Sequence, residues 1–249
     1  MKDHDTTHGR VLYTSRQPER LGAERGREQF TITRHGDGSR TLRAHCEIDD
    51  APNVMRDVVL TLDERWITRE AYVHLRVADR PVGTAWYRFE DHYAECEGFL
   101  ADRGRFSDRI EYDRPGEIFG AHPLQGDAWH LHAVDITNGP AVKLFDRFLM
   151  CSLDHRGATG PELHWRKPGM RVEYVGPATV EVAAGTFSAL HFCYGERGST
   201  ARGSNKTGDH PPYEIWTTDD GNYVLLKAHV TGYMQTHYEL THLEHEPAH

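Results

Sequence analysis

The stretch from Tyr223 to Leu243 reads YVLLKAHVTGYMQTHYELTHL and gives the clearest indication of the fold. Its even positions alternate with a more polar odd set, and they are Val224, Leu226, Ala228, Val230, Gly232, Met234, Thr236, Tyr238 and Leu240. A period of two places the two sets on opposite faces of an extended strand, whereas a helix would mix them. We therefore predict that the even face is core. A run of this length is rare in one strand, so Gly232 is expected to mark a bend or bulge.

The same alternation recurs along the chain. Arg40–Ile48 alternates in this way, and the turn Gly36-Asp37-Gly38-Ser39 joins it to Gln29–Arg34 as a hairpin. The segment Asp127–Val134 fits either a short helix capped by Asp127 or a strand. Further strands are predicted at Trp66–Val77, Thr84–Phe89, Tyr93–Leu100, Phe106–Tyr112, Ala141–Leu153, Met170–Val175, Thr179–Ala183, Thr186–Tyr194 and Tyr213–Thr217.

Many short strands with short connections predict an all-β fold. We expect a large antiparallel meander that is closed or nearly closed into a barrel with an internal cavity, with at most one or two short helices. Residues 1–249 are expected to form a single domain. Poorly ordered tails are predicted at 1–10 and 244–249, and a mobile loop at 195–211.

Composition restricts the classes of partner. The formal net charge is -9, which argues against nucleic acid because phosphate neutralisation needs an excess of Lys and Arg. No segment approaches the roughly 20 apolar residues of a membrane span, and the N-terminal MKDHDTTHGR carries no secretory signal. These features predict a cytoplasmic protein without a membrane partner. In that compartment the four thiols stay free, and they belong to Cys46, Cys96, Cys151 and Cys193.

Two C-terminal segments resemble a known family. Val180–Ala189, VEVAAGTFSA, resembles the V-x-V-P-A-G-T-F-x-A hairpin of a bacterial family of long β-meander domains without assigned function, with Ala183 where the family has Pro. Tyr213–Thr217, YEIWT, and the later Tyr238-Glu239-Leu240 resemble the strands that follow that hairpin. The match covers about 70 residues of the C-terminal part. It implies a barrel-like all-β fold and assigns no catalytic residue.

Acid–base groups gather on the odd face of the C-terminal stretch. Lys227, His229 and Tyr233 lie there, and an ammonium, an imidazole and a phenol can act as acid, base and stabiliser of negative charge. His122 and Asp127 belong to an irregular segment of the kind that covers a barrel opening. The alternatives are a solvated strand face for the first group and turn or helix caps for the second. We predict these five residues as catalytic.

Aromatic and polar side chains nearby are candidates for binding a substrate, and they are Trp216, Tyr213, Tyr72, His74 and Trp129. Together with the acid–base groups they predict a cofactor-independent enzyme of lyase, isomerase or dehydratase type. It would act on a hydrophobic, aromatic small molecule in the barrel cavity. A non-catalytic, lipocalin-like binding protein is the first alternative. The partner in both cases is a small-molecule ligand. The sequence also leaves open that the protein forms a homo-oligomer.

A metal-dependent enzyme is the second alternative. In a strand, His130 and His132 would project to one face, as in the H-x-H pair of metal-binding cupins. In a helix the same two side chains would diverge by about 200°. We expect no metal and no cofactor, with these two histidines as the ligands if a metal is bound.

Overall fold

The computed structural model describes residues 3–199 and 210–248. Over those residues the chain is an all-β fold with one short α-helix. Its main element is an antiparallel sheet of 14 strands in the order β10-β13-β14-β15-β16-β17-β1-β2-β3-β4-β5-β6-β7-β8. A second sheet has three strands in the order β12-β11-β9. The predictions of an all-β class and of a large antiparallel sheet are therefore confirmed.

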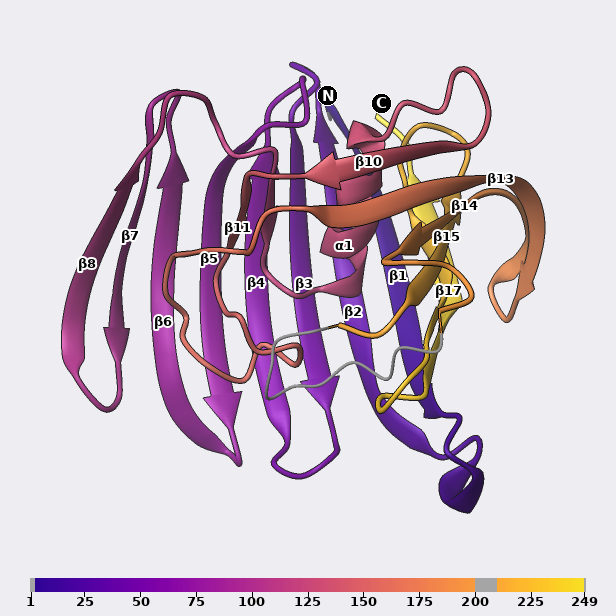
Figure 1. Cartoon of the computed structure of the whole chain (residues 1–249), viewed down its shortest axis with the longest axis horizontal. Coiled ribbons are helices and arrows are strands. Elements are labelled where there is room, and N and C mark those ends of the chain that lie inside the picture. The colour runs from indigo at the N-terminus through magenta and orange to yellow at the C-terminus, as the bar shows by residue number, and fades with distance from the viewer. Residues whose placement is uncertain (1–2, 200–209, 249) are drawn as a thin grey trace.

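The N-terminal half is a meander of eight strands in which each strand pairs with the one before it (Figure 1). A 3-10 turn at Pro18–Arg20 follows the first strand. Gly38, with a φ of 85°, forms part of the predicted turn between the second and third strands, because glycine has no Cβ to clash there. The bounds are β1 (His4–Ser15), β2 (Glu24–His35), β3 (Arg40–Ile48), β4 (Val54–Leu62), β5 (Thr68–Val77), β6 (Arg80–Phe89), β7 (Tyr93–Leu100) and β8 (Gly104–Glu111).

A compact insertion follows β8 and contains the helix. Its elements are β9 (Ile118–Gly120), α1 (Leu124–His130), a 3-10 turn (Leu131–Ala133), β10 (Ala141–Phe145), β11 (Phe148–Met150) and β12 (His164–Trp165). The segment that fitted either a helix or a strand is thus helical. The helix begins at Leu124, earlier than predicted, so Asp127 lies in its first turn and Pro123 occupies the N-cap.

The C-terminal half consists of β13 (Met170–Val182), β14 (Gly185–Tyr194), β15 (Tyr213–Thr218), β16 (Leu225–Val230) and β17 (Thr236–Glu246). The long run that opened the sequence analysis is two antiparallel strands, β16 and β17. The bend predicted at Gly232 is a complete reversal, in which Gly232 and Gln235 have φ of 65° and 40°. The even positions of both strands stay buried, namely Leu226, Ala228, Val230, Thr236, Tyr238 and Leu240, whereas Gly232 and Met234 in the reversal are partly exposed.

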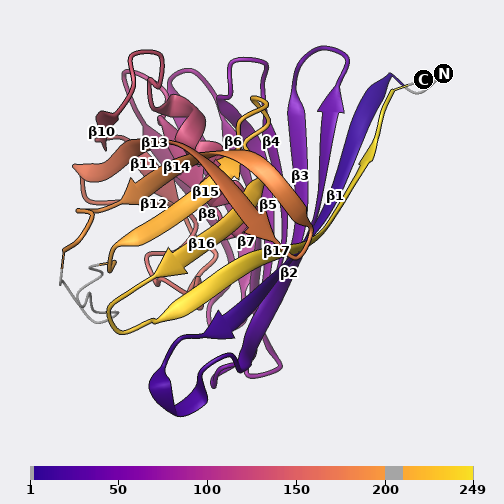
Figure 2. The same cartoon turned by 90° about the vertical axis from the view of Figure 1, so that its right-hand side faces the viewer.

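Both chain ends contribute more structure than predicted. β1 pairs along its length with β17 on one side and β2 on the other, and this pairing joins the two halves of the sheet (Figure 2). Residues 4–10 and 244–246, predicted as poorly ordered tails, are therefore strand. The reason is non-local, because a polar segment is held here by backbone pairing to distant partners. Of the predicted loop at 195–211, residues 200–209 lie outside the described residues.

The C-terminal strands turn back over one face of the N-terminal strands, and α1 lies between the two layers (Figures 1 and 2). The sheet starts at β10 and ends at β8, and within the described residues these edge strands do not pair with each other. The core fills the space between the layers, with Trp129 of α1 only 1% exposed. None of the helices in residues 3–199 and 210–248 combines the length and apolar character of a membrane span.

Candidate functional site

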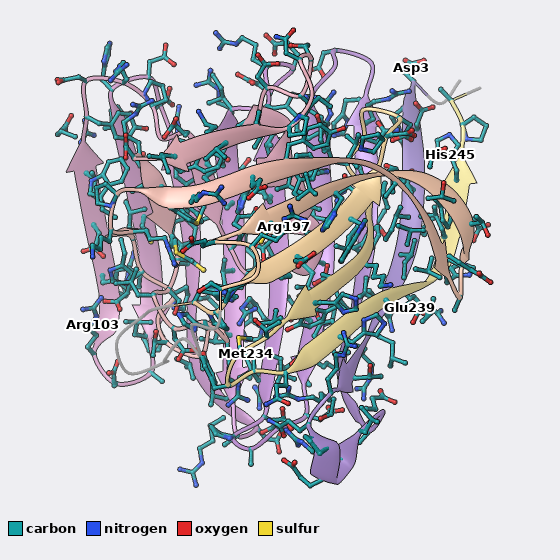
Figure 3. The ribbon with its side chains drawn as sticks, turned by 45° about the vertical axis from the view of Figure 1, so that its right-hand side comes forward. Asp3, Arg103, Arg197, Met234, Glu239 and His245 are labelled. Carbon is teal, nitrogen blue, oxygen red and sulfur yellow. The ribbon has the colours of Figure 1, made fainter. Side chains whose placement is uncertain are left out.

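A cavity of about 160 Å³ lies between the two layers beside α1. Its wall includes side chains from the N-terminal strands, from the segment around α1, and from β15 to β17. Residues that matter for its chemistry are Arg56, His122, Asp127, His155, Tyr213 and Tyr238. Met234, labelled in Figure 3, contributes an apolar side chain to the cavity wall from the turn that joins β16 and β17. The cavity therefore lies on the core side of the sheet.

Two charged residues occupy core positions of the strands below this cavity. On the inner face, Cys46 of β3 lies opposite Glu28 of β2 on one side and Arg56 of β4 on the other. Glu28 is 0% exposed and Arg56 is 2% exposed. The neighbouring inward-facing positions of the same strands are apolar, so both charged residues occupy places where apolar core residues are expected. Buried charges of this kind need hydrogen-bond partners.

Glu28 obtains its partners from the helix. Its carboxylate accepts backbone N–H groups of Leu124 at 2.7 Å and Gln125 at 3.0 Å, the first residues of α1. The hydroxyl of Tyr13 and the thiol of Cys46 also donate to it, at 3.2 and 3.4 Å. Burial raises the pKa of Glu28, and the four donors oppose that rise. Glu28 thus anchors α1 to β2 and fixes the floor of the cavity.

Asp127 presents a carboxyl group to the cavity. Its side chain keeps 29% of its surface accessible, and its Oδ1 lies 4.0 Å from His130 Nδ1. Burial, together with the nearby charge of Glu28, raises the pKa of Asp127 to about 7. A carboxyl group with a pKa near neutrality exchanges protons readily at physiological pH.

Three histidines line the same cavity. Burial lowers the pKa of His122 to about 3 and that of His210 to about 4, so both imidazoles are neutral. His122 Nε2 donates to the carbonyl oxygen of Ser152 at 3.1 Å, which leaves Nδ1 as an acceptor. The backbone φ of His122 is 73°, a strained value for a residue other than glycine. His155 shares a hydrogen bond of 2.6 Å with the hydroxyl of Tyr233.

Some polar atoms of the cavity wall lack a partner. In the part of the chain that the structure describes, seven buried side-chain polar atoms have no hydrogen bond. Three of them belong to cavity-lining residues: Arg56 Nε, His155 Nε2 and Tyr213 Oη. An unsatisfied buried polar atom costs about 1–3 kcal/mol. A molecule in the cavity that supplied partners would recover part of that cost.

The structure divides the predicted catalytic residues between two places. His122, Asp127 and Tyr233 line the cavity, whereas His229 and Lys227 lie on the face of β16 opposite the core. His229 bonds Arg16 and His237, with nitrogen–nitrogen distances of 3.1 and 3.0 Å. Burial lowers its pKa to about 3, and the charge of His237 adds to that effect. The expectation that the odd face of this stretch lines the cavity is therefore wrong for these two residues.

The predicted substrate-binding residues are divided in the same way. Tyr213 lines the cavity, but Trp216 lies on the outer face with its ring stacked on His191 at 4.2 Å and Lys227 Nζ 5.5 Å away. Trp129 is core rather than wall, and its ring packs edge-on against Trp66. Only one of the five predicted positions is thus at the cavity.

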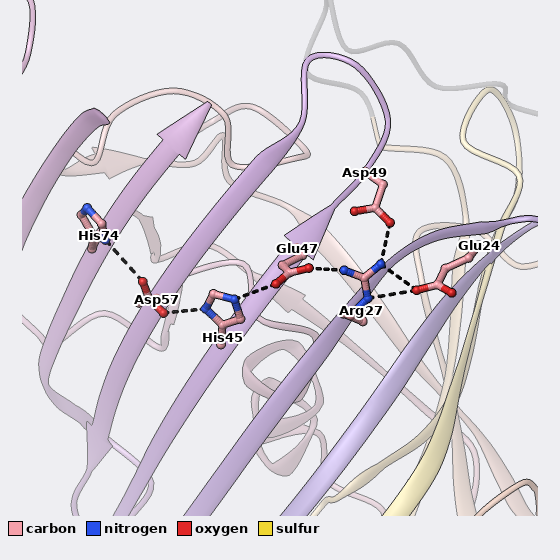
Figure 4. A network of polar contacts seen from close by, with 7 residues as sticks. All are labelled: Glu24, Arg27, His45, Glu47, Asp49, Asp57 and His74. Carbon is pink, nitrogen blue, oxygen red and sulfur yellow. Dashed lines mark hydrogen bonds and ion pairs between the residues drawn. The ribbon is translucent and has the colours of Figure 1, made fainter. Parts of the chain in front are cut away.

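Tyr72 and His74 face outward from β5, away from the cavity. His74 joins a row of paired charges that crosses four strands through Asp57, His45, Glu47 and Arg27 (Figure 4). Tyr72 is 41% exposed and lines a hollow of about 600 Å³ on this outer face. The larger volume does not make it the better site. Its histidines are already paired, as in the 2.6 Å contact of His45 with Asp57.

His130 and His132 do not converge on a shared position. His130 Nε2 donates to the carbonyl oxygen of Phe119 at 3.1 Å, and His132 Nδ1 donates to that of Trp129 at 2.7 Å. Burial lowers the pKa of each to about 4. Among residues 3–199 and 210–248, no group of three or more His, Cys, Asp or Glu is placed to hold a metal ion. The geometry gives the metal alternative no support.

Sequence reasoning missed Arg56 and Glu28, although a signal was present. In Val54–Leu62, VMRDVVLTL, Arg56 falls in register with the buried positions Val58 and Leu60. A charged residue in a core register indicates a buried polar site. The loop contacts of His155 and His210 had no comparable local signal, because they depend on which segments meet over the cavity.

Comparison with known proteins supports the fold and assigns no activity. No family model matches the chain, and no curated protein is significantly similar to it in sequence. A beta-barrel-like protein of the domain of unknown function DUF1849 from Brucella abortus has a similar structure, with a TM-score of 0.54 and 10% sequence identity over 99% of both chains. A protein with a YmcC-like fold from Bacteroides fragilis aligns over 98% of this chain and 96% of its own, with 8% identity and a TM-score of 0.30. The likeness to the DUF1849 protein extends over the whole chain, beyond the C-terminal part, and it places this chain among beta-barrel-like folds.

Proposed function

We propose that this protein binds a small, ring-sized molecule with polar groups inside the curled sheet, which acts as a nearly closed barrel around the ligand. The observation that carries the proposal is the set of unpartnered polar atoms around one cavity, from Arg56, His155 and Tyr213. Ligand sites combine an apolar wall with a few convergent polar groups, and this cavity has both. This is the binding protein of the lipocalin-like alternative.

The size and the wall of the cavity favour a ring. An engineered cavity of about 150 Å³ holds benzene, and this one has a volume of about 160 Å³. Tyr13 and Tyr238 meet edge to face, with ring centroids 4.9 Å apart at 84°, and Tyr213 lies 6.4 Å from Tyr238. Aromatic rings in this arrangement offer both faces and edges to a planar ligand.

A fragment screen by ligand-observed NMR tests the proposal. Val230 lines the cavity and is 3% exposed, so Val230→Phe fills part of the space. Val59→Phe adds the same side chain on the outer face of β4 and serves as the matched control. We expect ring-sized fragments to bind the wild type and the control, and to lose binding to Val230→Phe. Fragments that bind all three proteins equally, or no fragment binding at all, would contradict the proposal.

A second candidate is a cofactor-independent enzyme of lyase, isomerase or dehydratase type. The observation in its favour is Asp127, a cavity-facing carboxyl group whose pKa is raised to about 7 by burial. Asp127 would take up or release a substrate proton, and the free Nδ1 of the neutral His122 would accept one. The hydroxyl of Tyr213 would stabilise negative charge that develops on the ligand.

Proton exchange distinguishes the enzyme from the carrier. Each fragment that binds is incubated with the protein in deuterium oxide, and mass spectrometry follows deuterium uptake at carbon. The enzyme hypothesis predicts uptake that is lost in Asp127→Asn while fragment binding persists. Binding without any exchange favours the carrier.

A further inference from the structure

We propose that the molecule bound in the cavity is a small aromatic carboxylate, whose negative charge is held by Arg56. The inference rests on the proposed function, because it needs the cavity to be a ligand site. It specifies the chemical class of the ligand, a planar ring that carries an anionic group. It also specifies that the anionic group lies beside Arg56.

Arg56 is a buried cation without a counter-ion among the described residues. Arg56 is 2% exposed as a residue. Within the described residues no carboxylate forms an ion pair with its guanidinium. Its Nη2 donates to the backbone carbonyl oxygen of Arg156, and its Nε has no partner. Taking a cation out of water without a counter-ion is costly. A carboxylate is the group that fits a guanidinium best, since it accepts two parallel N–H groups.

Two acids of this region, Glu28 and Asp50, are already engaged. Glu28 lies two strands from Arg56, about 10 Å by the spacing of strands, and its oxygens accept four donors. Asp50 at the rim of the cavity is bound by Arg20 at 2.7 Å and by Arg25 Nε at 2.6 Å. Neither carboxylate is therefore available to Arg56. The charge of Arg56 opposes the rise that burial causes in the pKa of Asp127, the other acid of the cavity wall, but among the described residues the two form no ion pair. The guanidinium can therefore accept an external anion as its partner.

The balance of charge along the cavity wall also favours an anionic ligand. Three arginines line the cavity, Arg25, Arg56 and Arg156, against two acids, Asp50 and Asp127. Asp127 is protonated for part of the time at neutral pH, because burial holds its pKa at about 7. The wall is therefore positive on balance and attracts an anion.

The position of Arg56 is held by the chain around it. Gly157 has a φ of 61°, and a Cβ at this position would lie 2.3 Å from Arg56 Nη2. The loop thus packs directly against the guanidinium, to which it also offers the carbonyl oxygen of Arg156. We expect an anion to reach Arg56 from the cavity, whose wall also includes Tyr213 and Tyr238.

Benzoate and benzyl alcohol form a matched pair of probes, equal in ring and size and different in charge. Isothermal titration at about pH 6 measures their affinity for the wild type. Charge-assisted hydrogen bonds are about twice as strong as neutral ones, so we expect benzoate to bind roughly tenfold to a hundredfold more tightly. Arg56→Met should abolish this preference, whereas Arg43→Met, on the outer face of β3, should keep it.

Tyr213→Phe keeps the test decisive if Arg56→Met does not fold. It removes only an unpartnered hydroxyl, so we expect the apo variant to melt at the same temperature or higher and to bind benzoate about fivefold or more weakly. Tyr72→Phe is the control on the outer face. Equal affinities for benzoate and benzyl alcohol in the cavity would overturn the carboxylate inference and leave the proposed function standing. Binding of neither probe, while other fragments bind in a way that Val230→Phe abolishes, would overturn the inference as well. Loss of all fragment binding is the separate failure of the proposed function.

Discussion

Replacing Asp127 by Asn should make the protein more stable at neutral and alkaline pH. The carboxyl group lines the cavity, and burial raises its pKa from 3.8 to about 7. The folded state therefore holds this proton more tightly than the unfolded state does. For such a group, stability falls as pH rises from the unfolded pKa to the folded pKa, and the loss is complete above the folded pKa. Asn carries no titrating proton and escapes this loss.

The magnitude follows from the two pKa values. At 1.36 kcal/mol for each pKa unit, the rise from 3.8 to about 7 corresponds to on the order of 4 kcal/mol. Roughly 2.5 kcal/mol of it falls between pH 5 and pH 8, since part is already lost at pH 5. Above pH 8 the difference between wild type and variant should change little.

Urea unfolding of the wild type and Asp127→Asn at pH 5, 6, 7 and 8 measures the effect. The difference between the two free energies of unfolding isolates Asp127, because all other groups titrate in both proteins. Asp219→Asn, an exposed position in the turn before β16, is the control and should show a constant difference. A constant difference for Asp127→Asn as well would refute the reasoning.

Three further predictions concern other parts of the molecule. Glu28→Gln turns one carboxylate oxygen into an amide donor that faces N–H groups of α1. Urea unfolding at pH 7 should therefore show that the free energy of unfolding falls by about 1–3 kcal/mol. An unchanged midpoint would count against the role of Glu28 as an anchor. His229→Ala, on the outer face, should leave fragment binding within about twofold of wild type, and its loss without unfolding would return this residue to the site. Thiol titration should find four reactive groups after denaturation and almost none in the native protein. The reason is that all four cysteines are unpaired and buried, namely Cys46, Cys96, Cys151 and Cys193. Fast labelling of the native protein would contradict that burial.

Local alternation in the sequence predicts which residues become core, and it does so well in the C-terminal stretch. Val224, Ala228, Val230 and Leu240 are all buried as expected. The reversal at Gly232 was not predictable from the same pattern, because the turn keeps the parity of the two strands. Period-two alternation is identical for one long strand and for two strands joined by a turn of this length.

The location of the cavity required information that the pattern does not carry. Alternation separates two faces of a strand, and we assigned the polar face of Tyr223–Leu243 to the cavity. In the structure the cavity shares the concave face with the core, so Val230 and Tyr238 reach it while His229 does not. His122 and Asp127 were found because the sequence around them is irregular; in the structure His122 precedes α1 and Asp127 lies in its first turn. Arg56 was missed because no strand was predicted at Val54–Leu62, so its charge was not recognised as lying in a core register.

A crystal structure of the protein grown with benzoate at about pH 6 tests the central claim most directly. The account predicts density for one ring in the cavity, packed against Tyr213 or Tyr238, with the carboxylate within hydrogen-bond distance of the Arg56 guanidinium. Density for benzoate only in the outer hollow beside Tyr72, with the internal cavity holding no ligand, would contradict it.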